Sequence, residues 1–205
     1  MKRNMALFLA LALAFTAGCA FAEAARQDVT GAVEDGDYKN AYLGFGFHCG
    51  DWQVASETDI ASVYEKSEDY FTDDFAKAME QRDSLCFFMA KAGEGKESAM
   101  AVITNEGAAA GLYHALGFRT MYRMEAAKLK KNLESYGITV VSMEVGSIAV
   151  DGREMACMRI EESLDGVSMC VIEVSLIKGP YRIDIGASST DFDSAEAIMA
   201  RFFWL

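Results

Sequence analysis

Residues 150–188 read VDGREMACMRIEESLDGVSMCVIEVSLIKGPYRIDIGAS, and this stretch decides the fold of the 205-residue chain. Apolar and polar residues alternate through it, and the pairs Asp151-Gly152, Asp165-Gly166 and Gly179-Pro180 interrupt the alternation. A period of two is typical of strands, and short turns between consecutive strands require antiparallel pairing. We therefore expect four antiparallel strands over residues 138–150, 154–161, 168–178 and 181–187.

Two further strands and several helices complete the expected architecture. Strands are predicted over 85–91 and 98–104, and Ser56 with Asp59 forms a capping box that begins a helix over 57–65. Further helices are expected over 71–80 and 121–136, and a last one begins at Asp193, with Glu196 completing its capping box. The helix over 121–136 carries one apolar face, made of Tyr122, Ala126, Leu129, Leu133 and Tyr136. The sequence thus predicts an α+β fold, with a central antiparallel sheet of about six strands flanked by helices.

The N-terminus has the three parts of an export signal. Lys2 and Arg3 precede an apolar run over 5–15, and small residues follow it. The apolar run is shorter than the roughly 20 residues of a membrane-spanning helix. We expect residues 1–22 to be the signal, residues 23–38 to be a flexible acidic linker, and residues 39–205 to form a single α+β domain.

Two peptidases could process the stretch TAGCAFAEA, residues 16–24. Gly18 before Cys19 suits a lipid-attachment site, but Thr16 stands where an aliphatic residue is usual. The alternative cut, between Ala22 and Glu23, has the small residues Ala20 and Ala22 at the two positions that the peptidase inspects. We favour cleavage after Ala22, and lipidation of Cys19 stays open.

Composition narrows the class of partner. The chain carries 31 acidic and 19 basic residues, a net charge of −12. A surface of this charge repels phosphate backbones and is a poor match to anionic lipid. We therefore expect no nucleic-acid partner, and membrane attachment only through a lipid anchor.

Four cysteines lie beyond the signal: Cys49, Cys86, Cys157 and Cys170. A three-residue loop over 164–166 would place Cys170 opposite Ile160, so that Cys157 would point to the other face of the sheet. This register forbids a disulfide between Cys157 and Cys170. A disulfide between Cys49 and Cys86 stays open, and buried free thiols are the expected state.

No catalytic, metal or cofactor site is predicted. The sequence has no phosphate-binding loop, no Gly-x-Ser-x-Gly and no His-Glu-x-x-His. His48 and Cys49 are neighbours on an expected strand and therefore point to opposite faces. His114 is the only other histidine.

One segment resembles a family of enzymes. Asn105 precedes a predicted helix with Leu112-Tyr113 and then Leu116-Gly117-Phe118, which resembles the late segment of the acetyl-CoA-dependent N-acetyltransferases. The candidate for the phosphate-binding turn of that family, Gly93-x-Gly95, lies too close to Asn105 for the helix and strand that should intervene. The alternative interpretation makes Leu112, Tyr113 and Leu116 core residues.

A broader resemblance covers most of the chain. The order of an aromatic strand, a Gly-x-Trp turn, a mid-chain helix, a Gly-containing hairpin and a last helix is similar to small exported or lipid-anchored proteins of Gram-positive gut bacteria with a PsbP/Mog1-like fold. The positions that match are Tyr42, Gly44, Trp52, Gly152, Gly166, Lys178, Gly179, Tyr181 and Phe202. The resemblance implies a fold and supplies no catalytic residues.

These observations favour an exported, non-enzymatic protein of the cell envelope or extracellular space that binds another protein or a small ligand. An acetyltransferase and a purely structural envelope component stay open as alternatives. Tyr42, Phe45 and Trp52 are candidates for a binding surface, but we expect these aromatic side chains to belong to the core.

The processing site gives the first testable prediction. Mass spectrometry of the exported protein should find Glu23 as its first residue, because Ala20 and Ala22 supply small side chains at both positions that the signal peptidase recognises. A diacylglyceryl group on Cys19 would contradict this result.

Overall fold

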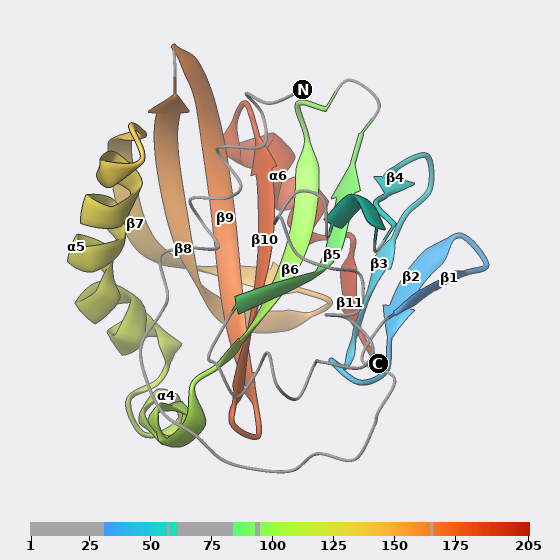
Figure 1. Ribbon diagram of the computed structural model, residues 1–205, viewed down its shortest axis with the longest axis horizontal. Helices are drawn as coiled ribbons and strands as arrows, with labels where there is room; N and C mark the ends of the chain where they lie inside the picture. Colours follow the sequence, from blue (N-terminus) through green and yellow to red (C-terminus); the bar gives the residue numbers. More distant parts are fainter. Residues whose placement is uncertain (1–30, 57, 61–83, 93–94, 165) are drawn as a thin grey trace.

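The computed structural model describes residues 31–56, 58–60, 84–92, 95–164 and 166–205. Within them, two antiparallel sheets and three α-helices form an α+β fold (Figure 1). The larger sheet has seven strands in the order β4-β5-β6-β10-β9-β8-β7, and the smaller has four in the order β1-β2-β3-β11. The predicted α+β class with a central antiparallel sheet is confirmed. The smaller sheet was not predicted.

The long strands of the larger sheet follow the alternation in the sequence. Its members are β4 (Gln53–Val54), β5 (Ser84–Lys91), β6 (Ser98–Asn105), β7 (Thr139–Val150), β8 (Arg153–Leu164), β9 (Val167–Lys178) and β10 (Tyr181–Ser189). Asp151 and Gly152 both have positive φ, 46° and 73°, as a type I′ hairpin turn requires. The six strands expected here are all present, and β4 is the seventh.

The β8–β9 hairpin has a different register from the expected one. Leu164 pairs directly with Val167, so the loop has two residues, Cys170 lies opposite Glu161 and Cys157 lies opposite Val174. Cys157 and Cys170 therefore share one face of the sheet. Four residues of strand separate them, about 13 Å at the usual rise per residue. All four described cysteines are buried free thiols, as expected, although the reason given for Cys157 and Cys170 was wrong.

Helices cover both faces of the larger sheet. On one face α5 (Phe118–Ser135) packs with Tyr122, Leu129 and Leu133 against Met158 and Ile160. On the other face α6 (Phe192–Met199) packs against β9 and β10. The short α4 (Ala110–Leu116) precedes α5 and follows a 3₁₀ turn, η2 (Gly107–Ala109). Because both faces are buried, apolar alternation alone does not show which residues of neighbouring strands share a face, and this caused the error in register.

The smaller sheet consists of β1 (Ala32–Glu34), β2 (Asp37–Asn40), β3 (Phe45–His48) and β11 (Phe202–Trp204). The expected flexible linker over 23–38 is therefore wrong for residues 32–38, where β1 and β2 form a hairpin that pairs with β3. Residues 23–30 lie outside the described part of the chain. The turn Asp35-Gly36, with φ of 54° and 84°, is another type I′ turn.

An aromatic cluster joins the smaller sheet to the larger one. Phe45, Phe47 and Phe202 surround Phe88 of β5, with ring centroids 4.9–6.2 Å apart. The Tyr38 ring also contacts Phe88, with the two ring centroids 4.5 Å apart and the ring planes tilted. Such contacts bury large apolar areas, so they attach the smaller sheet to the core.

Two helix starts can be compared with expectation. Ser56 N donates to Asp59 Oδ2 at 3.1 Å and Asp59 N donates to Ser56 Oγ at 3.2 Å, which confirms that capping box. The rest of the helix expected over 57–65, beyond Ile60, and all of that expected over 71–80 lie outside the described residues. The start predicted at Asp193 was wrong, because Asp191 is the N-cap and accepts a hydrogen bond from Ser194 N at 2.7 Å.

The end of the chain also differs from expectation. The sequence predicts an apolar face of the last helix made of Ile198, Met199, Phe202 and Phe203, but Phe202 and Phe203 lie beyond the end of α6. Instead they lie in β11, which pairs with β3. No helix among the described residues is long and apolar enough to cross a membrane.

The pairing of β11 with β3 generates a prediction about Gly46. A Cβ atom at Gly46 would lie 2.2 Å from the Phe203 ring, which occupies the space above the glycine. Gly46→Ala must therefore displace the ring, and we expect it to lower the free energy of unfolding by about 1–3 kcal/mol in urea denaturation.

Gly111→Ala is the matched control. A Cβ atom there meets no atom within 4 Å, and Gly111 lies in α4, where alanine is favoured over glycine by roughly 1 kcal/mol. Equal destabilisation by both substitutions would contradict the assigned contact between Gly46 and Phe203.

Candidate functional site

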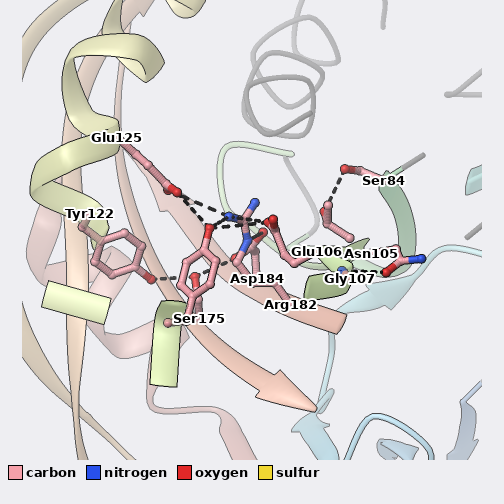
Figure 2. A network of polar contacts seen from close by, with 11 residues as sticks. Ser84, Asn105, Glu106, Gly107, Tyr122, Glu125, Ser175, Arg182 and Asp184 are labelled. Atoms are coloured by element: carbon pink, nitrogen blue, oxygen red, sulfur yellow. Dashed lines mark hydrogen bonds and ion pairs between the residues drawn. The ribbon is translucent and has the colours of Figure 1, made fainter. Parts of the chain in front are cut away.

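The candidate site is a buried polar network on the face of the larger sheet that α4 and α5 cover (Figure 2). In β10 the residues Ile183 and Ile185 point to the α6 side, so the alternate residues Arg182 and Asp184 point toward α4 and α5. The Arg182 side chain is only 2% exposed. A buried guanidinium requires carboxylate partners, and the neighbouring elements supply them.

Arg182 contacts carboxylates from three elements. Its Nη1 lies 2.9 Å from Glu106 Oε1, just after β6, and 3.8 Å from Glu125 Oε2 on α5. Its Nε donates to Asp184 Oδ2 at 3.0 Å on the same strand. The guanidinium therefore connects β10 with the segment that follows β6 and with α5.

Tyr113 of α4 occupies the centre of the network. Its hydroxyl donates to Glu125 Oε1 at 2.8 Å and accepts a hydrogen bond from Arg182 Nη1. The Arg182 guanidinium carbon also lies 5.5 Å from the centre of the Tyr113 ring, within cation–π range. One buried side chain thus attaches α4 to both α5 and the sheet.

A second branch of the network reaches further along α5. Asp184 Oδ1 accepts a hydrogen bond from Ser175 Oγ at 2.6 Å, and Ser175 Oγ lies 2.7 Å from the Tyr122 hydroxyl. Figure 2 shows this chain of contacts running from the strand toward the helix. It holds the first half of α5 against β9 and β10.

Backbone contacts hold the connection between β6 and α4. The amides of Glu106 and Gly107 both donate to the Pro180 carbonyl, at 2.9 and 3.1 Å, and the Gly107 amide also donates to Asn105 Oδ1 at 2.9 Å. The Gly179-Pro180 turn thereby fixes the segment that carries Glu106. The Glu106 carboxylate is thereby held next to the Arg182 guanidinium.

The network contains more carboxyl groups than cations. Glu173 of β9 is buried beside it, and one of its oxygens, Oε1, has no hydrogen-bond partner among the described residues. Burial raises the pKa of Glu173 well above its ordinary value, and the Asp184 carboxylate raises it further while Arg182 opposes the shift. Burial also raises the pKa of Glu106, against the effect of Arg182. These surroundings favour the protonated form of Glu173 over its carboxylate.

Glu162 of β8 is a separate buried carboxyl group on the same face of the sheet. It is 1% exposed, and its Oε2 has no hydrogen-bond partner within the described ranges. Burial raises its pKa from 4.5 to about 7. The folded protein therefore favours the protonated form of Glu162 below neutral pH.

The arrangement is suited to holding α4 and α5 against the sheet. Its charged groups contact one another, and Arg182 is almost completely shielded from solvent. The described residues contain no group of three or more His, Cys, Asp or Glu placed to bind a metal ion. Through the Arg182 guanidinium, the network links β10, the segment after β6 and α5.

The aromatic residues considered as a binding surface belong to the core. Phe45 and Trp52 are buried, and Tyr42 is partly buried. Lys178 Nζ donates to the Tyr42 carbonyl and lies over the Tyr42 ring. His48 is exposed and Cys49 is buried, so these neighbours do point to opposite sides. Cys19, Ala22 and Glu23 lie outside the described residues, as does the turn at Gly93.

The acetyltransferase-like segment has a different arrangement from the expected core helix. Tyr113 is buried, as expected, but Leu112 and Leu116 are 52% and 45% exposed. The expectation that both leucines are core contacts was wrong. Ala110 and Tyr113 are the buried residues of α4, and the side of this short helix that carries Leu112 and Leu116 lies in solvent.

Sequence reasoning missed Arg182, Asp184, Glu106 and Glu173. In YRIDIG the charged residues alternate with isoleucines, which is typical of a strand with one solvent-exposed face. The signal that could have identified them is the helix over 118–135, whose apolar stripe must cover one face of this same sheet.

Replacement of Arg182 tests the network. Arg182→Met should lower the free energy of unfolding by about 3–5 kcal/mol at pH 7, because it leaves buried carboxylates without their cation. The loss should shrink as the pH falls toward about 5, since burial raises the pKa of Glu106 and its protonation removes one of the unpaired charges. Urea denaturation at both pH values measures it.

Arg123→Met on the exposed side of α5 is the matched control for Arg182→Met. It should change the free energy of unfolding by less than about 0.5 kcal/mol. A loss for Arg182→Met that is small or independent of pH would show that the ion pairs contribute little.

Glu162 gives a separate prediction of pH dependence. Its folded-state pKa of about 7 lies above the ordinary value of 4.5, so the unfolded chain loses this proton first as the pH rises. Glu162 therefore lowers the free energy of unfolding between pH 4.5 and 7, by about 3 kcal/mol at most. Glu162→Gln should remove this decline, and an unchanged pH profile would contradict the assignment.

Comparisons with known proteins complete the description of the site. No protein-family model and no curated protein matches the chain. A crystal structure from Bacteroides thetaiotaomicron is similar over 87% of this chain and 49% of its own, with 9% identity and a TM-score of 0.43. The solution structure of cyanobacterial PsbP (CyanoP) from Synechocystis covers 92% of this chain and 98% of its own, with 11% identity and a TM-score of 0.40.

A third similar structure is a protein of unknown function from Pseudomonas aeruginosa, described as a putative regulator. It covers 55% of this chain and 72% of its own, with 16% identity and a TM-score of 0.31. This chain spans about half the length of the Bacteroides chain. The structures similar to this α+β chain thus include a PsbP protein, and these likenesses assign it neither a family nor an activity.

Proposed function

We propose that this chain is an exported, non-enzymatic accessory protein of the cell envelope or extracellular space. It binds its partner through the outer surface of α4 and α5. The basic and apolar residues before the small-residue stretch at the N-terminus support export. The resemblance to small exported proteins of Gram-positive gut bacteria supports the same compartment.

The observation that carries the proposal is the two-sided character of α4. Tyr113 turns inward and bonds Glu125 and Arg182, while Leu112 and Leu116 on the same helix remain largely in solvent. The network already fixes the position of α4, so its exposed leucines offer apolar area to a partner. Binding need not first order the helix. Binding to a pre-organised surface avoids part of the entropic cost of association.

The energetics of the network support a positional role for α4. A buried ion pair is often no more stabilising than well-packed apolar side chains of similar size, because desolvation opposes the attraction between the charges. Its directional contacts instead specify one geometry. Here they specify where α4 lies, which is what a binding surface requires.

Site-specific photo-crosslinking tests this proposal. A photoreactive residue at position 112 should give adducts with a protein or with lipid in producing cells, because the partner covers α4. The same residue at position 33, where Val33 of β1 is similarly exposed, is the control and should give none.

Two outcomes would contradict the proposal. Adducts that form equally from both positions would show that α4 is not a preferred contact. A crosslink between two copies of the chain, with light scattering that reports an oligomer, would instead favour a structural component of the envelope.

A further inference from the structure

The solvent side of α5 is basic, although the chain as a whole is acidic. Within Phe118–Ser135 the exposed cations are Arg119, Arg123, Lys128, Lys130 and Lys131. The helix carries two acidic residues, and Glu125 turns toward the network at Tyr113 and Arg182. Only Glu134 offsets the cations on the outer side, where it lies 3.9 Å from Lys130.

Apolar side chains lie among these cations. Met124, on the outer side of α5, is 65% exposed, and the exposed Leu112 and Leu116 of α4 precede the first turn of α5. At 100° per residue, Arg123, Met124, Lys128, Lys130 and Lys131 all lie on the half of α5 opposite Leu129, and Arg119 lies at its edge. This half therefore combines positive charge with protruding apolar groups.

We infer that the outer side of α4 and α5 docks on an anionic bilayer surface. Lysine and arginine near such a surface are attracted to the headgroups, and isolated apolar side chains enter the region between headgroups and acyl chains. An acidic protein could also attract the cations. A bilayer suits the side chains better, because Met124 and the two leucines protrude separately and the long lysine stems can extend toward headgroups.

This inference revises the expectation drawn from net charge. At distances well beyond the Debye length, an anionic membrane repels a chain of net charge −12. Within a Debye length of about 8–10 Å, however, the local charge of the approaching face decides the interaction. The charges are segregated, so one face can be attracted while the molecule as a whole stays acidic.

Docking by α5 would also set the orientation of the protein. Figure 1 shows α5 at one side of the molecule and the smaller sheet with β1 and β2 at the other. The smaller sheet would then point away from the membrane. If Cys19 is lipidated, the acyl chains and the basic helix would act as the two signals that stable attachment requires.

The inference rests on the proposed function, since it names the partner of the same surface. The two can fail separately. Crosslinks from position 112 to a protein, without any lipid binding, would leave the proposed contact surface in place and overturn only the membrane as its partner.

Vesicle sedimentation tests the inference with the chain purified after export. Vesicles of phosphatidylcholine with 30% phosphatidylglycerol should bind the protein at low salt, and 0.5 M NaCl should release it. Lys128→Gln with Lys131→Gln should weaken binding at low salt by about 30-fold, from about fivefold for each lysine. Neither lysine has an ion pair among the described residues, so the fold should be unaffected.

Lys91→Gln with Lys96→Gln makes the same change of charge on the β5–β6 hairpin and is the matched control. It should leave vesicle binding within about twofold of the unmodified chain. Equal weakening by both pairs, equal binding to pure phosphatidylcholine, or no binding to either vesicle would overturn the inference. Binding that resists both salt and the Lys128 and Lys131 substitutions would also overturn it, because an apolar segment elsewhere would then be responsible.

Discussion

The buried guanidinium of Arg182 is the constraint on which the α4–α5 side of the molecule depends. A cation inside a sheet must be surrounded by acceptors, and these come from Asp184, Glu106 and Glu125. Glu106 must therefore lie directly after β6, where the Pro180 carbonyl holds its amide. The Tyr113 side chain must point from α4 toward Arg182 for the same reason, and these contacts fix the position of α4.

Burial on both faces of the larger sheet explains which features could be predicted from sequence and which could not. The strands of the segment 138–187 and the capping box at Ser56 were predicted, because alternation and turn residues are local signals. The register around Cys170 was not, because an apolar stripe does not say which of two buried faces it joins. Arg182 was missed because a charge that alternates with isoleucine resembles an exposed face, whereas α4 and α5 cover this face in the structure.

The separation of charges links the structure to the proposed role. The inner side of α5 contributes Glu125 to the network, and the outer side holds the lysines and arginines in solvent. The net charge of the whole chain describes neither the inner nor the outer side of α5. The proposed contact surface thus lies on a helix whose inner side is fixed by buried charges. The hairpin at residues 32–40 extends the fold on the other side. That hairpin lies where an acidic sequence indicated only a linker, because Tyr38 supplies the apolar contact with Phe88 that attaches it to the core.

The central claim is that the network holds α4 and α5 against the sheet. Native-state hydrogen exchange of Tyr113→Phe, read by mass spectrometry for each segment, tests it most directly. The substitution removes one hydroxyl, which bonds Glu125 and Arg182, and keeps the ring. Amides of α4 and the first half of α5 should then exchange faster, while those of β8 and β9 keep their protection. Unchanged protection of α4 and α5, or a uniform loss throughout the chain, would contradict the claim.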